Sequence, residues 1–125
     1  VTYLPRSAAG VNRYGFDQSR LLARAVAREL GAECLSVFRR RLTLFLREQK
    51  HLDAAARRRN MQSAFLLSDK GRTAVAACEL LVLVDDVITT GASLAGCISL
   101  LDKEQRGKVV CLTVGTTPSS KKTAK

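Results

Sequence analysis

Two adjacent acidic residues, Asp85 and Asp86, follow an apolar run and come just before a turn rich in hydroxyl groups. Ionised carboxylates accept hydrogen bonds from sugar hydroxyls and hold the water shell of Mg²⁺. Side-chain hydroxyls, a close backbone approach at glycine and the free amides that begin a helix attract phosphate. The order of these groups predicts a sugar-phosphate site, whose phosphate-binding turn consists of Thr89, Thr90, Gly91, Ala92 and Ser93.

The apolar run at residues 80–84 predicts the element that positions the acidic pair. Five apolar residues in succession, without alternation, are typical of a strand covered on both faces in a parallel sheet. We expect Asp85 and Asp86 at its carboxyl end, where open α/β sheets bind ligands. Because successive strand side chains point to opposite faces, one carboxylate would accept from ribose hydroxyls while the other faces the Mg²⁺ shell.

Two simpler interpretations of this stretch need to be weighed. An apolar strand ending in acids is also typical of a Walker B element, but its partner G-x-x-x-x-G-K-[ST] occurs nowhere in the chain. The other interpretation is a plain strand, turn and helix in which Asp86 or Thr90 caps the helix. Capping a helix needs only one polar residue of this kind, so the whole series of acids and hydroxyls at residues 85–93 favours a ligand site.

The segment around the acidic pair resembles the phosphoribosyl pyrophosphate (PRPP) motif of type I phosphoribosyltransferases. Two further stretches are similar to signatures of the ComF-like, competence-associated branch of that family. One runs from Tyr14 to Gln18 and continues through Leu21, Leu22 and Ala23; the other comprises Gln49, Leu52, Arg57 and Asn60, followed by Ala64 and Phe65. The chain departs from the family at Tyr14, where Arg is common and Arg13 comes one step earlier, and at Leu46, where Thr is usual.

The resemblance implies a transferase in which a nitrogen nucleophile displaces pyrophosphate from C1 of Mg²⁺-bound PRPP. Asp85 and Asp86 would be the catalytic residues, holding the ribose and, through water, the Mg²⁺ cofactor, while residues 89–93 hold the 5′-phosphate. Such a reaction depends on positioning and charge more than on covalent chemistry from the protein. The loop after the first strand corresponds to the pyrophosphate side, and the candidates there are Pro5, Arg6, Ser7, Arg13, Lys50 and Arg57. For each single arginine, a solvated surface charge is the alternative.

The position of Thr89 bears on the acceptor. Some purine-salvage members of the wider superfamily place an acid there, which exchanges a proton with the incoming purine. Thr89 cannot do so near neutral pH. The resemblance therefore implies that purines are poor acceptors and leaves the nitrogen acceptor unidentified.

The net charge of +10 is unevenly distributed. Residues 39–62 hold eight Lys or Arg against two acids, while residues 63–102 hold two against five. The arm 39–60 could close over the site as a lid. A second hypothesis is a binding module that keeps the PRPP site as a sensor or relic and uses this arm on single-stranded DNA, or on competence proteins, during DNA uptake. The arm offers only Phe38 and Phe45 for base stacking, which favours the enzyme.

Length and composition fit one domain at residues 1–117, followed by a flexible polar tail at 118–125. The chain starts at Val1 without an initiator Met, so we expect a missing upstream part, where ComF-like proteins often carry a zinc module. The sequence predicts no membrane span and a cytoplasmic location, and it leaves a homodimer open. Buried, reduced thiols are favoured for the four cysteines, which are Cys34, Cys78, Cys97 and Cys111.

The remaining elements follow from periodicity and from turn residues. We expect strands at 1–4, 33–38, 64–67 and 109–114, a loop at 5–15, a turn at 68–71 and a connection at 105–108. Helices are expected around Leu22, Val26 and Leu30, after Asp53, and at 93–101. Strands that alternate with helices predict an α/β domain with a mostly parallel, twisted sheet flanked by helices, which the resemblance makes type I phosphoribosyltransferase-like.

Overall fold

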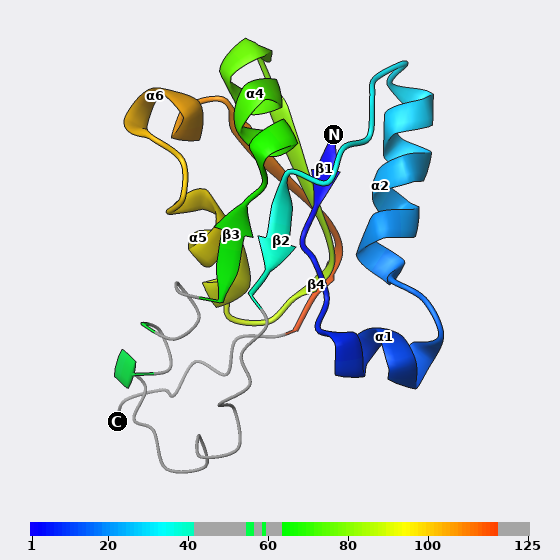
Figure 1. Cartoon of the computed structure of the whole chain (residues 1–125). Helices are drawn as coiled ribbons and strands as arrows, with labels where there is room; N and C mark the ends of the chain where they lie inside the picture. Colours follow the sequence, from blue (N-terminus) through cyan, green and yellow to red (C-terminus); the bar gives the residue numbers. More distant parts are fainter. Residues whose placement is uncertain (42–54, 57–58, 60–63, 118–125) are drawn as a thin grey trace, which may run out of the picture.

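A computed structural model describes residues 1–41, 55–56, 59 and 64–117. Its centre is a three-stranded parallel sheet in the order β1–β4–β5 (Figure 1). β1 covers Thr2–Tyr3, β4 Leu81–Ile88 and β5 Val109–Thr116. A separate antiparallel pair joins β2 (Phe38–Arg40) to β3 (Phe65–Leu67). The helices of the described residues are α1 (Ala8–Tyr14), α2 (Gln18–Glu29), α4 (Asp69–Ala77), α5 (Ala92–Ile98) and α6 (Lys103–Arg106).

Helices lie on both sides of the parallel sheet, as the sequence predicts for an α/β domain. α2 contacts β4 and β1 on one side, while α4, α5 and the β2–β3 pair lie on the other (Figure 1). The buried face of α2 consists of Ser19, Ala23 and Ala27, whose small side chains let the helix approach the strands closely. The helix begins after Asp17, whose carboxylate accepts from the Arg20 N–H at 3.1 Å.

The main apolar core lies between the central strand and the elements on the second side. Leu83 of β4 is fully buried among side chains from β2, β3, α4 and α5. Burial of each large apolar side chain contributes about 1.5–3 kcal/mol, so this cluster fixes β4 and the acidic pair that β4 carries. Its other large members are Phe38, Phe65, Val75, Leu94 and Leu101.

Two expected irregular segments are helical instead. The predicted loop 5–15 contains α1, because Ser7 caps the helix by accepting from the Gly10 N–H at 3.1 Å. The predicted turn at 68–71 begins α4, where Ser68 Oγ accepts from the Gly71 N–H at 2.9 Å. In both places serine and glycine mark a helix start rather than a loop.

Three element boundaries also differ from expectation. The strand expected at 33–38 is β2, at Phe38–Arg40. The first half of the connection expected at 105–108 belongs to α6, which begins with a capping box at Asp102. β4 does not stop at Val84 but continues to Ile88. Of the helix expected after Asp53, the described residues Ala55, Ala56 and Arg59 are helical. The rest of that segment and the tail 118–125 lie outside the described residues.

The cysteines do not share one environment. Cys97 is fully buried, and burial raises its pKa to about 12. Cys34 and Cys78 are half-buried, whereas Cys111 is exposed on β5, so the prediction of burial is wrong for Cys111. All four are free thiols. Among the helices of the described ranges, none has the length and apolar character to cross a membrane.

Candidate functional site

The acidic pair lies where the neighbouring strand ends. β1 pairs with β4 only at Leu83 and Val84, and the chain then leaves the sheet after Leu4 donates its N–H to Val84 O at 2.9 Å. Asp85 and Asp86 are therefore inside β4, not at its carboxyl end, which corrects the expectation from the sequence. On the β1 side they have no strand partner, because β1 has already turned away, and the loop after β1 lies there instead.

Asp85 is held firmly inside the protein, with only 8% of its surface exposed. Its Oδ1 accepts from Ser19 Oγ at 3.1 Å and from the Asp86 N–H at 2.9 Å. Burial raises the pKa of Asp85, and a hydrogen bond with the Asp86 carboxyl raises it further. This carboxylate is a fixed acceptor whose ionisation costs free energy.

Asp86 has a different environment although it is the next residue. Its carboxylate pairs with the Arg6 guanidinium and is one-quarter exposed. Burial alone would raise its pKa, but the Val87 N–H, Asp85 and Arg6 together hold the pKa below its ordinary value. The neighbours thus divide the pair into a buried acceptor and a more accessible, ionised carboxylate.

Both acids line a hollow of about 240 Å³. The loop between β1 and α1 forms another of its walls, so the structure brings Pro5, Arg6 and Ser7 to the acidic pair. A smaller hollow of about 60 Å³ shares Asp85, Val87 and Ser93 with the first. Its wall includes the rest of the hydroxyl-rich turn, namely Thr89, Thr90, Gly91 and Ala92. We call these residues, 5–7, 85–86 and 89–93, the acidic site.

The backbone of the turn leaves open space at Gly91, where the sequence predicts a close approach. Gly91 has φ +75°, a left-handed conformation that favours glycine, and nothing lies within 4 Å of where its Cβ would be. Thr90 Oγ1 accepts from the Ala92 N–H at 3.3 Å, while Asp86 makes no cap and α5 has no side-chain cap bond. Neither Asp86 nor Thr90 is therefore the N-cap of α5, which is Gly91, although the Thr90 hydroxyl accepts from the first amide of the helix. Because α5 has only seven residues, the groups that this turn offers are its hydroxyls and loop amides.

Arg13, another of the predicted cations, is not brought to the acidic site. The Arg13 guanidinium lies 5.7 Å from the Tyr14 ring centroid, and Arg13 lines neither hollow. Arg6 also contacts this ring, at 5.6 Å, so it links Tyr14 to Asp86. Lys50 and Arg57 lie outside the described residues.

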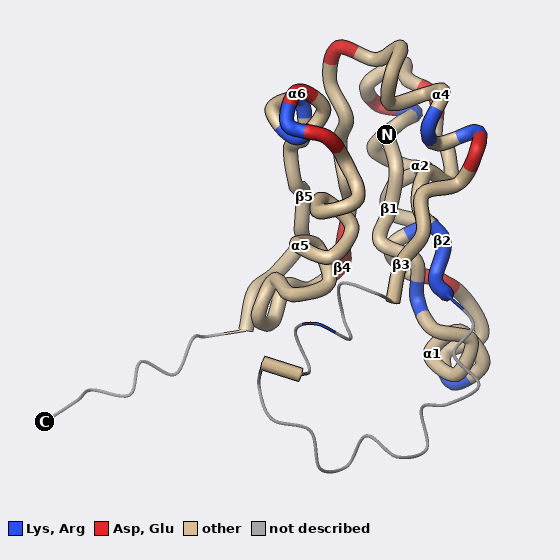
Figure 2. The backbone as a smooth tube through the Cα atoms, turned by 60° about the vertical axis from the view of Figure 1, so that its left-hand side comes forward, with Lys and Arg blue, Asp and Glu red and all other residues tan. Residues whose placement is uncertain are grey.

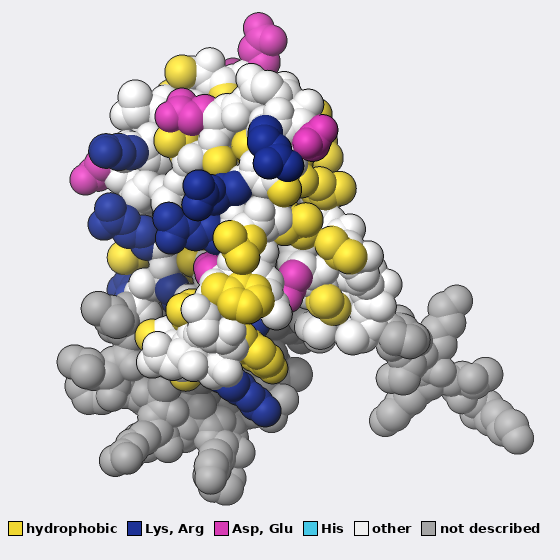
Figure 3. Space-filling model, turned by 90° about the vertical axis from the view of Figure 1, so that its right-hand side faces the viewer, with side chains coloured by type: hydrophobic (Ala, Val, Ile, Leu, Met, Phe, Trp, Pro, Cys, Tyr) yellow, Lys and Arg dark blue, Asp and Glu magenta, His cyan; other side chains and the backbone are white. Residues whose placement is uncertain are grey.

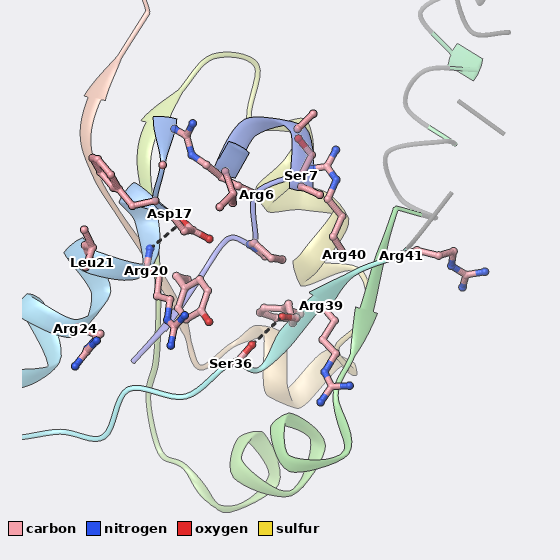
Figure 4. A pocket seen from close by; sticks show the side chains of 18 residues that line it. Arg6, Ser7, Asp17, Arg20, Leu21, Arg24, Ser36, Arg39, Arg40 and Arg41 are labelled. Atoms are coloured by element: carbon pink, nitrogen blue, oxygen red, sulfur yellow. Dashed lines mark hydrogen bonds between the residues drawn. The ribbon is translucent and has the colours of Figure 1, made fainter. Parts of the chain in front are cut away.

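A larger cavity of about 880 Å³ adjoins the acidic site. The cavity and the 240 Å³ hollow share four lining residues, Pro5, Arg6, Ser7 and Arg40. Figure 4 shows arginines reaching it from α2 and from the β2 segment. Asp17 is its only acidic lining residue among those described. We call it the arginine cavity, after Arg6, Arg20, Arg24, Arg39, Arg40 and Arg41.

Sequence reasoning missed this cavity. The spacing of Arg20 and Arg24 on one helix face and the run of three arginines from Arg39 were both visible. What the sequence lacks is the information that α2 and β2 face one cavity. Figure 2 shows the basic residues along β2, and Figure 3 shows basic side chains gathered on one face of the molecule.

Comparison with known proteins finds two curated relatives, both named DNA utilization protein YhgH. One is from Salmonella typhi and the other from Salmonella typhimurium strain LT2; each is 38% identical over 91 residues. The match covers 71% of this chain, but only 37% of the length of each relative. No protein-family model and no solved structure matches the chain.

Proposed function

We propose that this domain binds PRPP and transfers its phosphoribosyl group to a nitrogen nucleophile, as its resemblance to ComF-like type I phosphoribosyltransferases implies. The observation that carries the proposal is the meeting of three separate segments. The acidic pair, the turn 89–93 and the loop 5–7 line hollows that share residues. These are the segments that the resemblance assigns to ribose, 5′-phosphate and pyrophosphate.

Each part of the site suits one part of the donor. The fixed Asp85 carboxylate and the ionised Asp86 accept hydrogen bonds from ribose hydroxyls. Ser93 lines both hollows and joins the turn that takes the 5′-phosphate. Arg6 and Arg40 both line the hollow beside the acids and the loop, and Arg6, which belongs to that loop and contacts Asp86, is the partner we assign to the pyrophosphate.

The donor set fits Mg²⁺ in an indirect role. Within residues 1–41, 55–56, 59 and 64–117, no three His, Cys, Asp or Glu side chains gather as a metal-binding group. Mg²⁺ commonly keeps several waters and uses one or two carboxylates together with substrate phosphates. Asp85 and Asp86 would hold those waters, and the ion would neutralise charge on the departing pyrophosphate.

The proposed reaction needs orientation more than covalent help from the protein. The acceptor nitrogen forms a bond to C1 of the ribose while the bond from C1 to the pyrophosphate oxygen breaks. The electron pair of that bond leaves with pyrophosphate, and the nitrogen gives up its proton to solvent. The acids fix the ribose, and Arg6 stabilises negative charge on the leaving group.

Calorimetric titration with Mg²⁺-PRPP tests this proposal. Changing Asp85 and Asp86 together to Asn should abolish binding while the protein stays folded, because Asn keeps the acceptor oxygen but loses the charge. The matched control is Glu79→Gln, an exposed residue before the amino end of β4. Unchanged PRPP affinity in the double variant would rule out the assignment of the site.

A second candidate function is binding of single-stranded DNA, and the name of the relatives favours it. The exposed Arg39, Arg40 and Arg41 would supply phosphate contacts. Fluorescence anisotropy with a labelled oligonucleotide, with and without PRPP, separates the two functions. A chain that binds the oligonucleotide but never PRPP would be a DNA-binding module.

A further inference from the structure

Among the residues that the structure describes, the arginine cavity has six arginines in its lining and one acidic residue, Asp17. Arg6 pairs with Asp86, and the Arg40 guanidinium lies 5.4 Å from the centroid of the Phe65 ring. In the described part of the chain, Arg20, Arg24 and Arg39 form no ion pair. Asp17, the acidic residue in the lining, is occupied in capping α2.

The arrangement of these arginines has an electrostatic cost. Arg20 and Arg24 are four residues apart on α2, a spacing at which like charges destabilise a helix by about 0.2–0.5 kcal/mol. Arginines from the β2 segment add further charge across the same cavity (Figure 4). An anionic ligand would relieve this repulsion and give the guanidinium groups their preferred bidentate partners.

The remaining wall indicates what else the ligand carries. Tyr3 and Phe16 line the cavity, and Phe16 is 47% exposed. A half-exposed ring among guanidinium groups can stack on a flat heterocycle. The volume of about 880 Å³ is within the range of small-molecule pockets.

We propose that the arginine cavity binds the acceptor of the reaction and that this acceptor is an anionic, planar nitrogen compound of about nucleoside monophosphate size. This inference rests on the proposed function, because the acidic site must hold PRPP for the neighbouring ligand to act as acceptor. The two regions share Arg6, which places the ligand next to the pyrophosphate side. A ring N–H nitrogen of the ligand forms the new bond to C1 while the bond from C1 to the pyrophosphate oxygen breaks. Pyrophosphate leaves with that electron pair, and the proton of the nitrogen passes to solvent.

A longer nucleic-acid strand fits the cavity less well. Strand-binding surfaces repeat aromatic platforms along a charged groove so that successive bases can stack. Here Phe16, in the segment that joins α1 to α2, is the exposed aromatic residue of the described lining. The lining thus offers one exposed ring for stacking.

Paired ligands provide the test, with the full chain titrated calorimetrically. CMP should bind more tightly than cytidine, and AMP more tightly than adenosine, because only the monophosphates carry charge. Changing Arg20 and Arg24 together to Gln should lower the affinity for CMP at least about tenfold and leave the affinity for Mg²⁺-PRPP unchanged. The matched control changes Arg28 and Arg72 to Gln, since both are exposed and neither lines the cavity.

The outcomes are distinct. Equal affinity for monophosphates and nucleosides, or equal losses in the two double variants, would overturn the anionic site. An oligonucleotide that binds where CMP does not would replace it with strand binding. If CMP binds through Arg20 and Arg24 but PRPP does not bind, the acceptor role fails together with the proposed function, whereas PRPP binding without CMP binding overturns this inference alone.

Discussion

The acidic site and the arginine cavity adjoin each other, but they differ in whether their charged side chains already have partners within the protein. In the acidic site each carboxylate already has a partner in the protein, Ser19 for Asp85 and Arg6 for Asp86. In the arginine cavity, Arg20, Arg24 and Arg39 have no carboxylate partner among the described residues. Under the proposed function, the difference separates a preorganised site for the sugar and phosphates of PRPP from a region whose arginines lack carboxylate partners among the described residues and would accept an anion.

The largest expected effect concerns which acceptors the two regions together can use. Thr89, at the edge of the smaller hollow, cannot exchange a proton with a purine near neutral pH. Hypoxanthine and guanine should therefore react about 10²–10⁴-fold more slowly than they would with a positioned base. Single-turnover release of pyrophosphate from PRPP, measured over a panel of nucleobases, ammonia and amines, checks this. Efficient turnover specific for purines would show that Thr89 has been misread.

Arg6 joins the two regions, so its loss should affect both. Arg6→Gln leaves Asp86 without its guanidinium partner and removes a cation from each lining. We expect affinity for Mg²⁺-PRPP to fall about 10- to 100-fold and affinity for CMP to fall as well. Arg13→Gln is the control, because Arg13 also contacts Tyr14 but lines none of these spaces. A loss confined to one ligand would mean that the regions are separate.

How far the sequence predicts these regions depends on how each is assembled. The acidic site lies mainly in one continuous segment, so the order of residues 80–93 indicated its strand and its turn, whereas the left-handed conformation of Gly91 came from the structure. The arginine cavity depends on α2 and β2 facing each other, and no local pattern records that placement. α1 and α4 were missed for a smaller reason, since Ser7 and Ser68 are as typical of loops as of helix caps.

The smallest expected effect is on stability and depends on pH. The pKa of Asp85 is raised in the folded protein, so the folded state loses stability as rising pH ionises this buried carboxyl. Asp85→Asn removes that cost and keeps the acceptor for Ser19, which should raise Tm by about 2–4 °C at neutral pH. The difference should shrink as pH falls and Asp85 becomes protonated.

The measurement is thermal unfolding of the unmodified protein and of the Asp85→Asn variant across acid and neutral pH, with Glu79→Gln as control. Asp86 contributes in the opposite direction, because its lowered pKa gives stability that is lost as pH falls. That contribution is present in both proteins and largely cancels in the comparison. A Tm difference that grew toward acid pH would contradict the assigned environment of Asp85.

The most direct test of the account is whether the two regions hold two ligands at once. Mg²⁺-PRPP is titrated calorimetrically into the full chain, first alone and then with CMP at saturation. We predict one PRPP per chain in both titrations, with an affinity that CMP does not reduce, because ribose and phosphates lie on the acidic site while CMP lies on Arg20 and Arg24. Loss of PRPP binding in the presence of CMP would show that both anions compete for a single site and would contradict the division described here.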